Sequence, residues 1–181
     1  NLNKLVVLGD SLSAAYNISE DSGWVNLLQA RLDDLASPPT SCWQVINASI
    51  SGETSGGGAA RIGDILSRHQ PQLLIVELGG NDGLRGLAIK QFRGNLETII
   101  QQARQADVKV LLAGIQIPTN YGPLYRIRFE AVYTDLSERL HVPLVPFLLQ
   151  NVATNAELML GDGIHPNAIA QPIILENIWP Y

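Results

Sequence analysis

Three residues of this chain could together supply a nucleophile, a general base and an acid that orients the base. Ser11 stands in the sequence Gly-Asp-Ser-Leu-Ser, and Asp162 and His165 stand together in Gly-Asp-Gly-Ile-His-Pro. An aspartate that accepts a hydrogen bond from an imidazole fixes the tautomer of the ring, which can then take the proton of a serine hydroxyl. The order Ser, Asp, His is one that catalytic triads use. These residues therefore predict nucleophilic acyl transfer.

The other two histidines are predicted at helix ends. His69 precedes Gln-Pro and His141 precedes Val-Pro, and a histidine at such a position can bind free carbonyl groups or favour the helix dipole. We therefore interpret both as structural or solvent-facing and assign the base to His165. Taken alone the Asp-x-x-His pattern is weak, because Asp162 could cap the last helix and His165 could be an ordinary loop residue.

Acyl transfer also needs hydrogen-bond donors for the oxyanion that forms on the substrate carbonyl. Gly52, in Ser-Gly-Glu-Thr, can offer its backbone N–H, and Asn81, in Gly-Gly-Asn-Asp, can offer its side-chain amide. The N–H of Ser11 is a third donor if that residue opens a helix. Gly52 could equally be a turn glycine, and Asn81 could begin an ordinary turn. We hypothesise an oxyanion hole made of Ser11, Gly52 and Asn81.

Apolar runs that alternate with segments of helical spacing indicate how these residues are positioned. Five runs are typical of buried parallel strands: Leu5–Leu8, Val45–Ala48, Leu73–Leu78, Val108–Ile115 and Val142–Phe147. Helices are predicted at Trp24–Leu35, Ile62–Leu66, Phe92–Ala103, Phe129–Leu140 and from Pro166 to Trp179. Ser22 or Asp21 can cap the first of them.

This alternation predicts one α/β domain over residues 1–181. Right-handed crossovers then give a three-layer α/β/α sandwich around a flavodoxin-like, five-stranded parallel sheet. Each polar cluster directly follows a predicted strand or lies in a loop between elements. We therefore expect Ser11, Gly52, Asn81 and His165 to meet at one edge of the sheet.

Composition excludes several other classes of function. The net charge of −5 argues against nucleic acid or an anionic lipid surface as a partner. No apolar stretch approaches the roughly 20 residues that a membrane helix needs. Cys42 is the single cysteine, which excludes an internal disulfide and a multi-cysteine metal site, and we interpret it as a buried or half-buried thiol. The start at Asn1, without a Met, suits a processed mature form as well as a shortened chain.

Four segments resemble the sequence blocks of the SGNH, or GDSL-type, hydrolase family, and the resemblance spans nearly the whole chain. They are Gly9–Ser13, Gly52, Gly80–Asp82 and Asp162–Pro166. Within the family the chain is most similar to bacterial multifunctional thioesterases and lysophospholipases, through Ser49–Thr54, Val76–Gly86 and Asn120–Gly122. It departs from that subfamily at Ala15, where glycine is usual, and in the glycine-rich run of residues 55–58.

The resemblance implies that Ser11 is the nucleophile, His165 the base and Asp162 the residue that orients it. Ser11, Gly52 and Asn81 would then form the oxyanion hole. It also implies hydrolysis of acyl esters and thioesters, including acyl-CoA, lysophospholipids, and aryl and fatty acyl esters, through an acyl-enzyme. No metal, cofactor, nucleic acid or stable membrane insertion is expected, and the resemblance implies a monomer that is periplasmic or secreted.

The loop after the fourth predicted strand is expected to bind the acyl chain. Residues 116–125 are largely apolar and aromatic, and the family resemblance implies that this loop helps to wall the acyl groove. We expect Ile117, Pro118 and Tyr121 to contact the acyl chain, although Ile117 could instead be a core residue beneath the loop. Because Ser11 lacks a Gly-x-Ser-x-Gly elbow, we also expect a shallow, adaptable site built from loops.

Three other functions remain as alternatives to an acyl hydrolase. A carbohydrate O-acetyl esterase of the same fold would need more polar groups beside the site than the 116–125 loop offers. A phosphate or flavin binder could use Ser51–Gly58, but this run lacks the Gly-Lys-Ser/Thr ending of a phosphate loop. A metal site of Asp10, Asp162 and His165 would have a single histidine, which is a poor signal for a transition metal.

Overall fold

Five parallel strands form one sheet at the centre of the molecule. The computed structural model describes residues 2–36 and 42–181, and the strand order is β2-β1-β3-β4-β5. The strands are β1 (Asn3–Gly9), β2 (Trp43–Asn47), β3 (Leu73–Glu77), β4 (Lys109–Ala113) and β5 (Leu144–Val145). This is the order of flavodoxin-like folds, whose ligands bind where the order reverses between β1 and β3. The predicted sheet is therefore confirmed.

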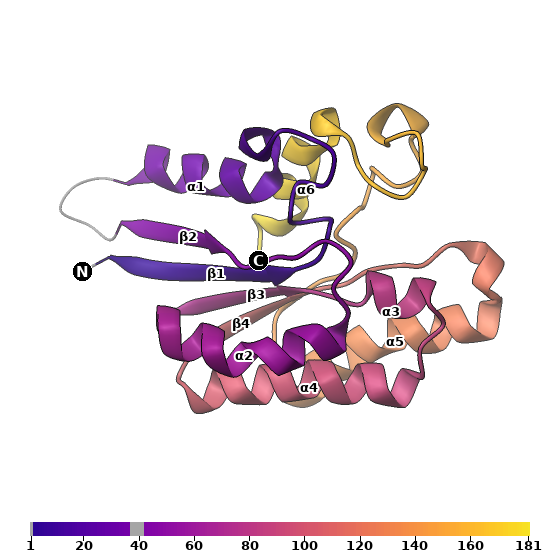
Figure 1. Ribbon diagram of the computed structural model, residues 1–181, viewed down its shortest axis with the longest axis horizontal. Helices are drawn as coiled ribbons and strands as arrows, with labels where there is room; N and C mark the ends of the chain where they lie inside the picture. The colour runs from indigo at the N-terminus through magenta and orange to yellow at the C-terminus, as the bar shows by residue number, and fades with distance from the viewer. Residues whose placement is uncertain (1, 37–41) are drawn as a thin grey trace.

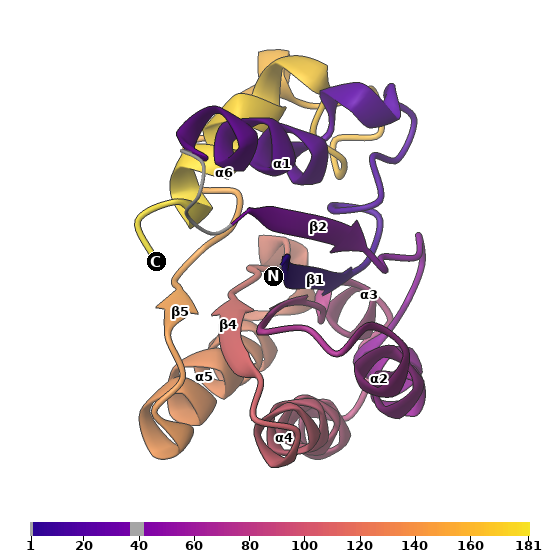
Figure 2. The same ribbon diagram turned by 90° about the vertical axis from the view of Figure 1, so that its left-hand side faces the viewer.

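Helices cover both faces of this sheet, as the sequence predicts (Figures 1 and 2). One face carries α1 (Trp24–Leu35) and α6 (Gln171–Ile178). The opposite face carries α2 (Ser55–His69), α4 (Ile89–Gln105) and α5 (Pro123–Leu140), with the short α3 (Gly80–Leu84) at the carboxyl end of β3. Four 3₁₀ turns complete the elements: η1 (Glu20–Ser22), η2 (Thr119–Tyr121), η3 (Ala156–Leu158) and η4 (Ala168–Ala170).

The core consists of side chains from the sheet and from both helix layers. Val6, Val7 and Leu8 of β1 are wholly buried, because this strand pairs on both edges and is covered on both faces. Below the sheet, the rings of Phe92 and Phe129 stack with centroids 4.7 Å apart. Each fully buried side chain of this kind stabilises the fold by about 1.5–3 kcal/mol. The core therefore provides a rigid base for the carboxyl ends of the strands.

The second helix begins earlier than its apolar spacing predicts. The expected start is near Ile62, whereas α2 starts at Ser55 and includes the glycine-rich run. Thr54 caps this start, because its hydroxyl accepts a hydrogen bond from the N–H of Gly57 at 3.3 Å. A side chain at Gly58 would overlap Leu78, so glycine lets the helix approach the end of β3. The run is therefore a helix start and not a phosphate-binding loop.

Other predicted boundaries and environments are corrected by the structure. Gly23 is the N-cap of α1, with no side-chain cap from Ser22 or Asp21. The last helix, α6, begins at Gln171 and not near Pro166, so Asp162 does not cap it. Cys42 is exposed, which makes the expectation of a buried or half-buried thiol wrong.

The region around the last two strands also differs from prediction. β5 contains only Leu144 and Val145, because prolines stand on both sides of it and cannot donate to the ladder. α5 begins at Pro123, several residues before Phe129, since proline is well suited to the first position of a helix. The loop that follows β4 is consequently shorter than the predicted span of residues 116–125.

Candidate active site

The structure brings the three predicted triad residues into hydrogen-bond contact. The Ser11 hydroxyl lies 2.9 Å from Nε2 of His165, and Nδ1 of His165 lies 2.6 Å from Oδ2 of Asp162. Ser11 follows β1, whereas Asp162 and His165 share one loop near the end of the chain. The fold thus joins residues 154 positions apart in the sequence. Both hydrogen bonds have lengths suited to proton transfer and to fixing a tautomer.

The loop that holds Asp162 and His165 stabilises the charge of the aspartate. Oδ1 of Asp162 accepts the backbone N–H of Ile164 at 2.9 Å and that of His165 at 3.0 Å. These bonds, together with the hydrogen bond from the His165 side chain, lower the pKa of Asp162 from 3.8 to about 2. Asp162 is therefore ionised throughout the neutral range and can stabilise an imidazolium on its neighbour.

The serine stands in a hydrogen-bonded turn that directly continues β1. The carbonyl of Asp10 accepts the N–H of Ser13 at 3.2 Å and of Ala14 at 2.9 Å, while its Oδ1 accepts the N–H of Leu12 at 3.0 Å. Residues 11–17 form turns and no helix, so the condition set above for the Ser11 N–H, that Ser11 opens a helix, is not met. The role of this N–H as an oxyanion donor stays a prediction.

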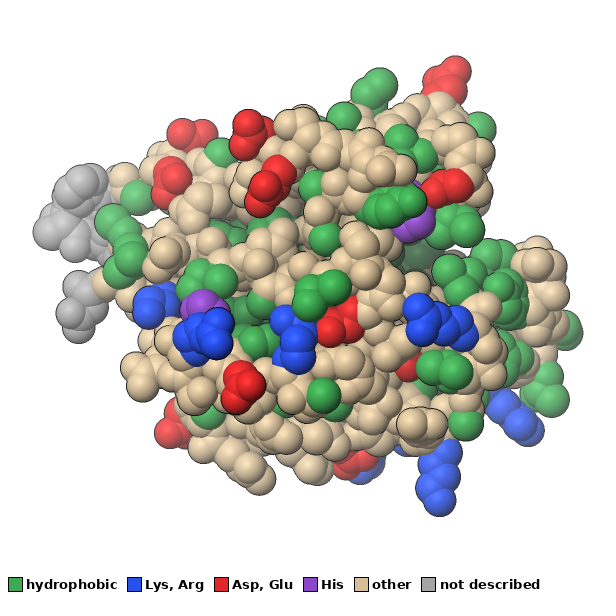
Figure 3. Space-filling view, viewed as in Figure 1, with side chains coloured by type: hydrophobic (Ala, Val, Ile, Leu, Met, Phe, Trp, Pro, Cys, Tyr) green, Lys and Arg blue, Asp and Glu red, His purple; other side chains and the backbone are tan. Residues whose placement is uncertain are grey.

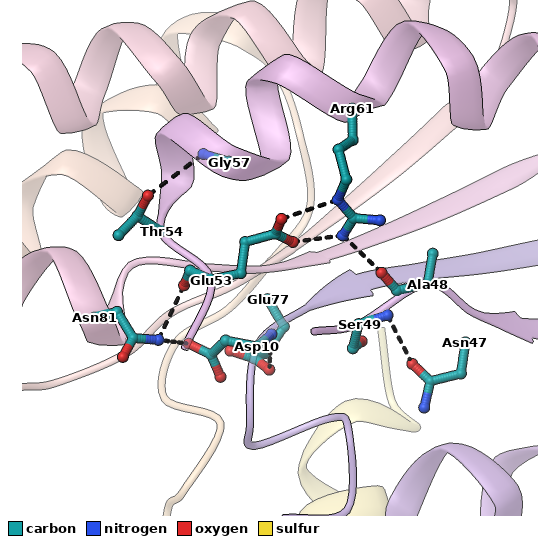
Figure 4. A network of polar contacts seen from close by, with 10 residues as sticks. All are labelled: Asp10, Asn47, Ala48, Ser49, Glu53, Thr54, Gly57, Arg61, Glu77 and Asn81. Carbon is teal, nitrogen blue, oxygen red and sulfur yellow. Dashed lines mark hydrogen bonds and ion pairs between the residues drawn. The ribbon is translucent and has the colours of Figure 1, made fainter. Parts of the chain in front are cut away.

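Asn81 lies in the short helix α3 and faces the start of α2 (Figure 4). Its side-chain amide donates to the carbonyl oxygen of Glu53 at 2.9 Å and to Oδ2 of Asp10 at 3.4 Å. Glu53 is held in turn by Arg61, whose Nε lies 2.9 Å from Oε1 of the glutamate. Asn81 was expected on a loop or in a turn, whereas it occupies a helix that these bonds hold in place.

Gly52 adopts a backbone conformation that few other residues would accept. Its φ is 82°, in the left-handed region that favours glycine, and it is exposed to solvent. Its carbonyl oxygen accepts a hydrogen bond from the Arg85 side chain at 3.2 Å. Gly52 does not line the pocket beside Ser11, so its part in the oxyanion hole stays a prediction.

Ser11 opens onto a pocket of about 540 Å³ at the carboxyl edge of the sheet. Ser11, Asn81 and His165 supply polar groups at its wall. The apolar part of the lining comes from the end of α3 and from several separate loops, and it includes Leu84, Ile115, Ile117, Pro118, Phe147, Leu149 and Met159. Figure 3 shows a hollow at the α3 end of the molecule, with hydrophobic side chains along its border. The pocket is large enough for a small hydrophobic group.

Two of the three predicted acyl-binding residues line this pocket. These two residues are Ile117 and Pro118. Ile117 is only 5% exposed, and it packs so closely against α3 that a side chain at Gly83 would overlap it. Ile117 is thus both a wall of the pocket and part of the core. Tyr121 lies outside the lining, and its hydroxyl instead donates to the carbonyl of Leu84 at 2.8 Å.

Some residues that build the site are missed by the sequence patterns. The Tyr16 ring lies against that of His165 with centroids 4.2 Å apart, which covers one side of the base. Asp82 is buried and accepts hydrogen bonds from the N–H of Ser55 at 2.8 Å and from its hydroxyl at 2.5 Å. This carboxylate ties α3, and with it Asn81, to the beginning of α2. In the sequence, the position of Asp82 next to Asn81 is the one feature that points to a place in the site.

The other two histidines lie away from Ser11, as predicted. His69 is the last residue of α2, and His141 follows α5 with a φ of 50°. His141 borders a larger hollow of about 1430 Å³ at the amino ends of the strands, which none of the predicted triad residues lines. The chemistry is therefore assigned to the smaller pocket, where, among the residues that the structure describes, a hydroxyl, an imidazole and a carboxylate meet.

A serine hydroxyl, an imidazole and a carboxylate in contact at the carboxyl edge of an α/β sheet are the arrangement that serine hydrolases use. Comparison with known proteins gives the family. Residues 7–171 match the model of the GDSL-like lipase/acylhydrolase family. The chain therefore belongs to the GDSL-like lipase/acylhydrolase family, whose SGNH-type fold it shares.

Individual members of this family are similar over almost the full chain. Esterase TesA of Pseudomonas aeruginosa is 49% identical over 176 residues, which are 97% of this chain and 86% of the relative. Thioesterase 1/protease 1/lysophospholipase L1 of Escherichia coli K12 is 44% identical over 172 residues, with 95% and 79% covered. The crystal structure of TesA superposes with a TM-score of 0.94 at 48% identity and covers 98% of this chain and 97% of its own.

Proposed function

We propose that this chain is a serine hydrolase that cleaves carboxylic esters and thioesters through an acyl-enzyme on Ser11. The observation that carries the proposal is the Ser11–His165–Asp162 contact at the wall of a largely apolar pocket. The names esterase and thioesterase 1/protease 1/lysophospholipase L1 that its relatives bear agree with this chemistry. Within that class we propose fatty acyl esters, acyl-CoA and lysophospholipids as substrates, because the pocket offers mainly apolar contacts to an acyl chain.

The geometry supports acylation as the first half of the reaction. Nε2 of His165 takes the proton of the Ser11 hydroxyl while the serine oxygen bonds to the substrate carbonyl carbon. The carbonyl oxygen becomes an anion, which the Asn81 amide and the proposed Gly52 and Ser11 N–H groups stabilise. The imidazolium then gives its proton to the departing alcohol or thiol, whose bond to the acyl carbon breaks. Ser11 is left as an ester of the acyl group.

Water completes the cycle with the same residues. His165 removes a proton from a water molecule, whose oxygen attacks the acyl carbon and forms a second oxyanion. When this intermediate collapses, the bond to the serine oxygen breaks and the imidazolium returns its proton to Ser11. Asp162 remains a carboxylate throughout and stabilises the imidazolium in both halves of the cycle.

A substrate panel tests the proposed function. We expect the wild-type protein to hydrolyse p-nitrophenyl esters of several chain lengths, acyl-CoA and a lysophospholipid, and to be labelled covalently by a fluorophosphonate. Ser11→Ala should lose at least about 10³-fold in kcat and all labelling, because no other hydroxyl in the described part of the chain is hydrogen-bonded to His165. Near-normal turnover by folded Ser11→Ala protein would refute the assignment.

The same panel contains the test of a carbohydrate O-acetyl esterase. Acetylated sugars should be poor substrates, since most of the accessible surface of the pocket wall is apolar. A preference for acetylated sugars over all fatty acyl esters would favour that alternative.

None of the described helices is long and apolar enough to cross a membrane. A monomer that is periplasmic or secreted remains our proposal.

A further inference from the structure

A second carboxyl group lies buried beneath the nucleophile and has no place in the mechanism above. Glu77 ends β3, has no exposed surface, and pairs in register with Gly9 of β1. Its Oε1 accepts hydrogen bonds from the Ser13 hydroxyl at 2.6 Å and from the N–H of Asp10 at 3.3 Å. Its Oε2 is buried and accepts from no donor among the described residues. One oxygen of Glu77 is thus engaged with the serine turn while the other lacks a donor.

Asp10, the neighbour of Glu77, is a second buried carboxyl, 2% exposed. The backbone N–H of Asp10 donates to Oε1 of Glu77, which brings the two carboxyl groups close together, and no ion pair of the described residues includes either of them. Two adjacent carboxylates without a cation would each lose hydration and repel one another, which costs several kcal/mol per charge. A pair in this position therefore retains one proton.

The hydrogen bonds around the pair show which residue keeps the proton. Asp10 receives donors on both of its oxygens, from the N–H of Leu12 at 3.0 Å and from the Asn81 amide at 3.4 Å. Burial raises the pKa of Asp10 to about 6, whereas burial and the charge of Asp10 raise the pKa of Glu77 well above its usual range. These directions, and donors on both oxygens of Asp10 but on only one of Glu77, favour Asp10 as the carboxylate and Glu77 as the acid. The free Oε2 of Glu77 is then a proton donor and needs no donor of its own.

We propose that Glu77 is a positioning residue that stays protonated and donates to Asp10, so that Asp10 holds the turn of Ser11 and the amide of Asn81 in register. This rests on the proposed function, because the reaction gives Ser11 and Asn81 their roles. Figure 4 shows Asp10 between Glu77 and Asn81. Glu77 is not among the residues that line the pocket, and it acts through Ser13 and through Asp10, which does line the pocket. Tight packing supports the arrangement, since a Cβ at Gly9 would lie 2.8 Å from Oε1 of Glu77.

Infrared spectroscopy tests the protonation state without any assay of activity. Wild-type protein at neutral pH should show the carbonyl band of a protonated carboxylic acid, and Glu77→Gln should lack it. Glu53→Gln is the matched control, because Glu53 is also buried but is paired with Arg61 and should contribute no such band. Loss of the band in Glu53→Gln, or its absence from the wild type, would overturn the proposal. The same band should persist in Ser11→Ala, so this result does not depend on the proposed function.

Kinetics test the positioning role. Glu77→Gln keeps a donor and an acceptor and should retain kcat within a few-fold of the wild type. Glu77→Leu keeps the side-chain volume but can neither accept nor donate a hydrogen bond. Its kcat should fall by about 10- to 100-fold, with KM little changed, and the fall should not exceed the effect of losing one oxyanion donor. A folded Glu77→Leu protein with normal kcat, or an equal loss in both variants, would contradict the role. If Glu77→Leu does not fold, the positioning role is tested by kcat of Glu77→Gln, which should stay within a few-fold of the wild-type value. A larger loss in that variant would contradict the role.

The pH profile separates this role from a purely structural one. Loss of the Glu77 proton at alkaline pH would place a second negative charge beside Asp10, and wild-type kcat should then decline. Glu77→Gln cannot lose such a proton and should keep its alkaline plateau. The pair also interacts electrostatically with Asp82 of α3, Tyr133 of α5 and His165. These three residues are the same in the wild type and in Glu77→Gln, so they do not account for a difference between the two pH profiles. Identical alkaline limbs in the two proteins would overturn the proposal.

Discussion

Replacement of Asn81 by alanine separates transition-state stabilisation from substrate binding. In the resting structure the Asn81 amide donates to the carbonyl of Glu53 at 2.9 Å and more weakly to Asp10 at 3.4 Å. The weaker contact leaves one amide proton available when an oxyanion forms. An oxyanion donor contributes roughly 10²–10³-fold to kcat, about 2.7–4 kcal/mol. We therefore expect Asn81→Ala to lower kcat by that factor while KM changes little.

The stability of the variant gives a second, smaller number. The bond to Glu53 is lost on truncation, and one such neutral hydrogen bond contributes about 0.5–1.5 kcal/mol to folding. The loss of transition-state stabilisation calculated from kcat, about 2.7–4 kcal/mol, should thus exceed the loss in the free energy of unfolding, about 0.5–1.5 kcal/mol. Steady-state kinetics with a p-nitrophenyl ester measure the first, and urea unfolding followed by circular dichroism measures the second.

Asn95→Ala provides a matched control for this experiment. Asn95 also donates from its amide to the start of α2, to the Ser55 hydroxyl at 3.0 Å, but it does not line the pocket. It should lose a similar amount of stability and keep kcat within a few-fold. A raised KM with unchanged kcat in Asn81→Ala would refute the reasoning, because Asn81 would then bind ground-state substrate. Equal kcat losses in both variants would show a structural effect.

Three further predictions concern the pocket wall, the base and the orienting acid. Ile117→Ala should flatten the preference for longer acyl esters and leave acetyl ester hydrolysis little changed, since each buried methylene contributes up to about 0.8 kcal/mol; an equal loss for short and long p-nitrophenyl esters would make Ile117 a stability residue alone. His165→Ala should be nearly inactive and His141→Ala should not; an inactive His141→Ala would reassign the base. Because the folded pKa of Asp162 is lowered to about 2, its carboxylate stabilises the fold above pH 3.8 and this contribution is lost as the pH falls toward 2; Tm of Asp162→Asn should therefore vary less over that window than Tm of the wild type, and parallel curves would contradict the assignment.

The sequence predicts most of the sheet and the triad, because their signals are local. The buried run Leu5–Leu8 leads directly into the Ser11 turn, and the Asp162 and His165 spacing fits a single loop. Parallel strands with both faces covered are uniformly apolar, which also makes them easy to recognise. The meeting of these segments at one edge then follows from the topology alone.

The residues that sequence patterns miss depend on contacts between distant segments. Glu77 reads as an ordinary polar end to an apolar strand, and only the pairing of β1 with β3 places it beneath Asp10. Residues 55–58 read as a loop because glycine disfavours helices, yet Gly58 lies so close to Leu78 that a side chain at this position would overlap it. Tyr16 likewise lies against His165 only after the first and last thirds of the chain have met.

His165 and Asp162 both stand on one short exposed hairpin, and their position there affects how the protein should lose activity on heating. Met159 pairs with Pro166 at its base, the N–H of Leu160 donates to the carbonyl of His165 at 2.7 Å, and residues 161–164 are exposed. A segment with few apolar contacts opens at a smaller free-energy cost than the buried sheet beneath it. Local opening would displace Asp162 and His165 together while β1 still holds Ser11. Activity should therefore fade reversibly on heating at temperatures where the circular dichroism of the sheet and helices is still that of the native protein.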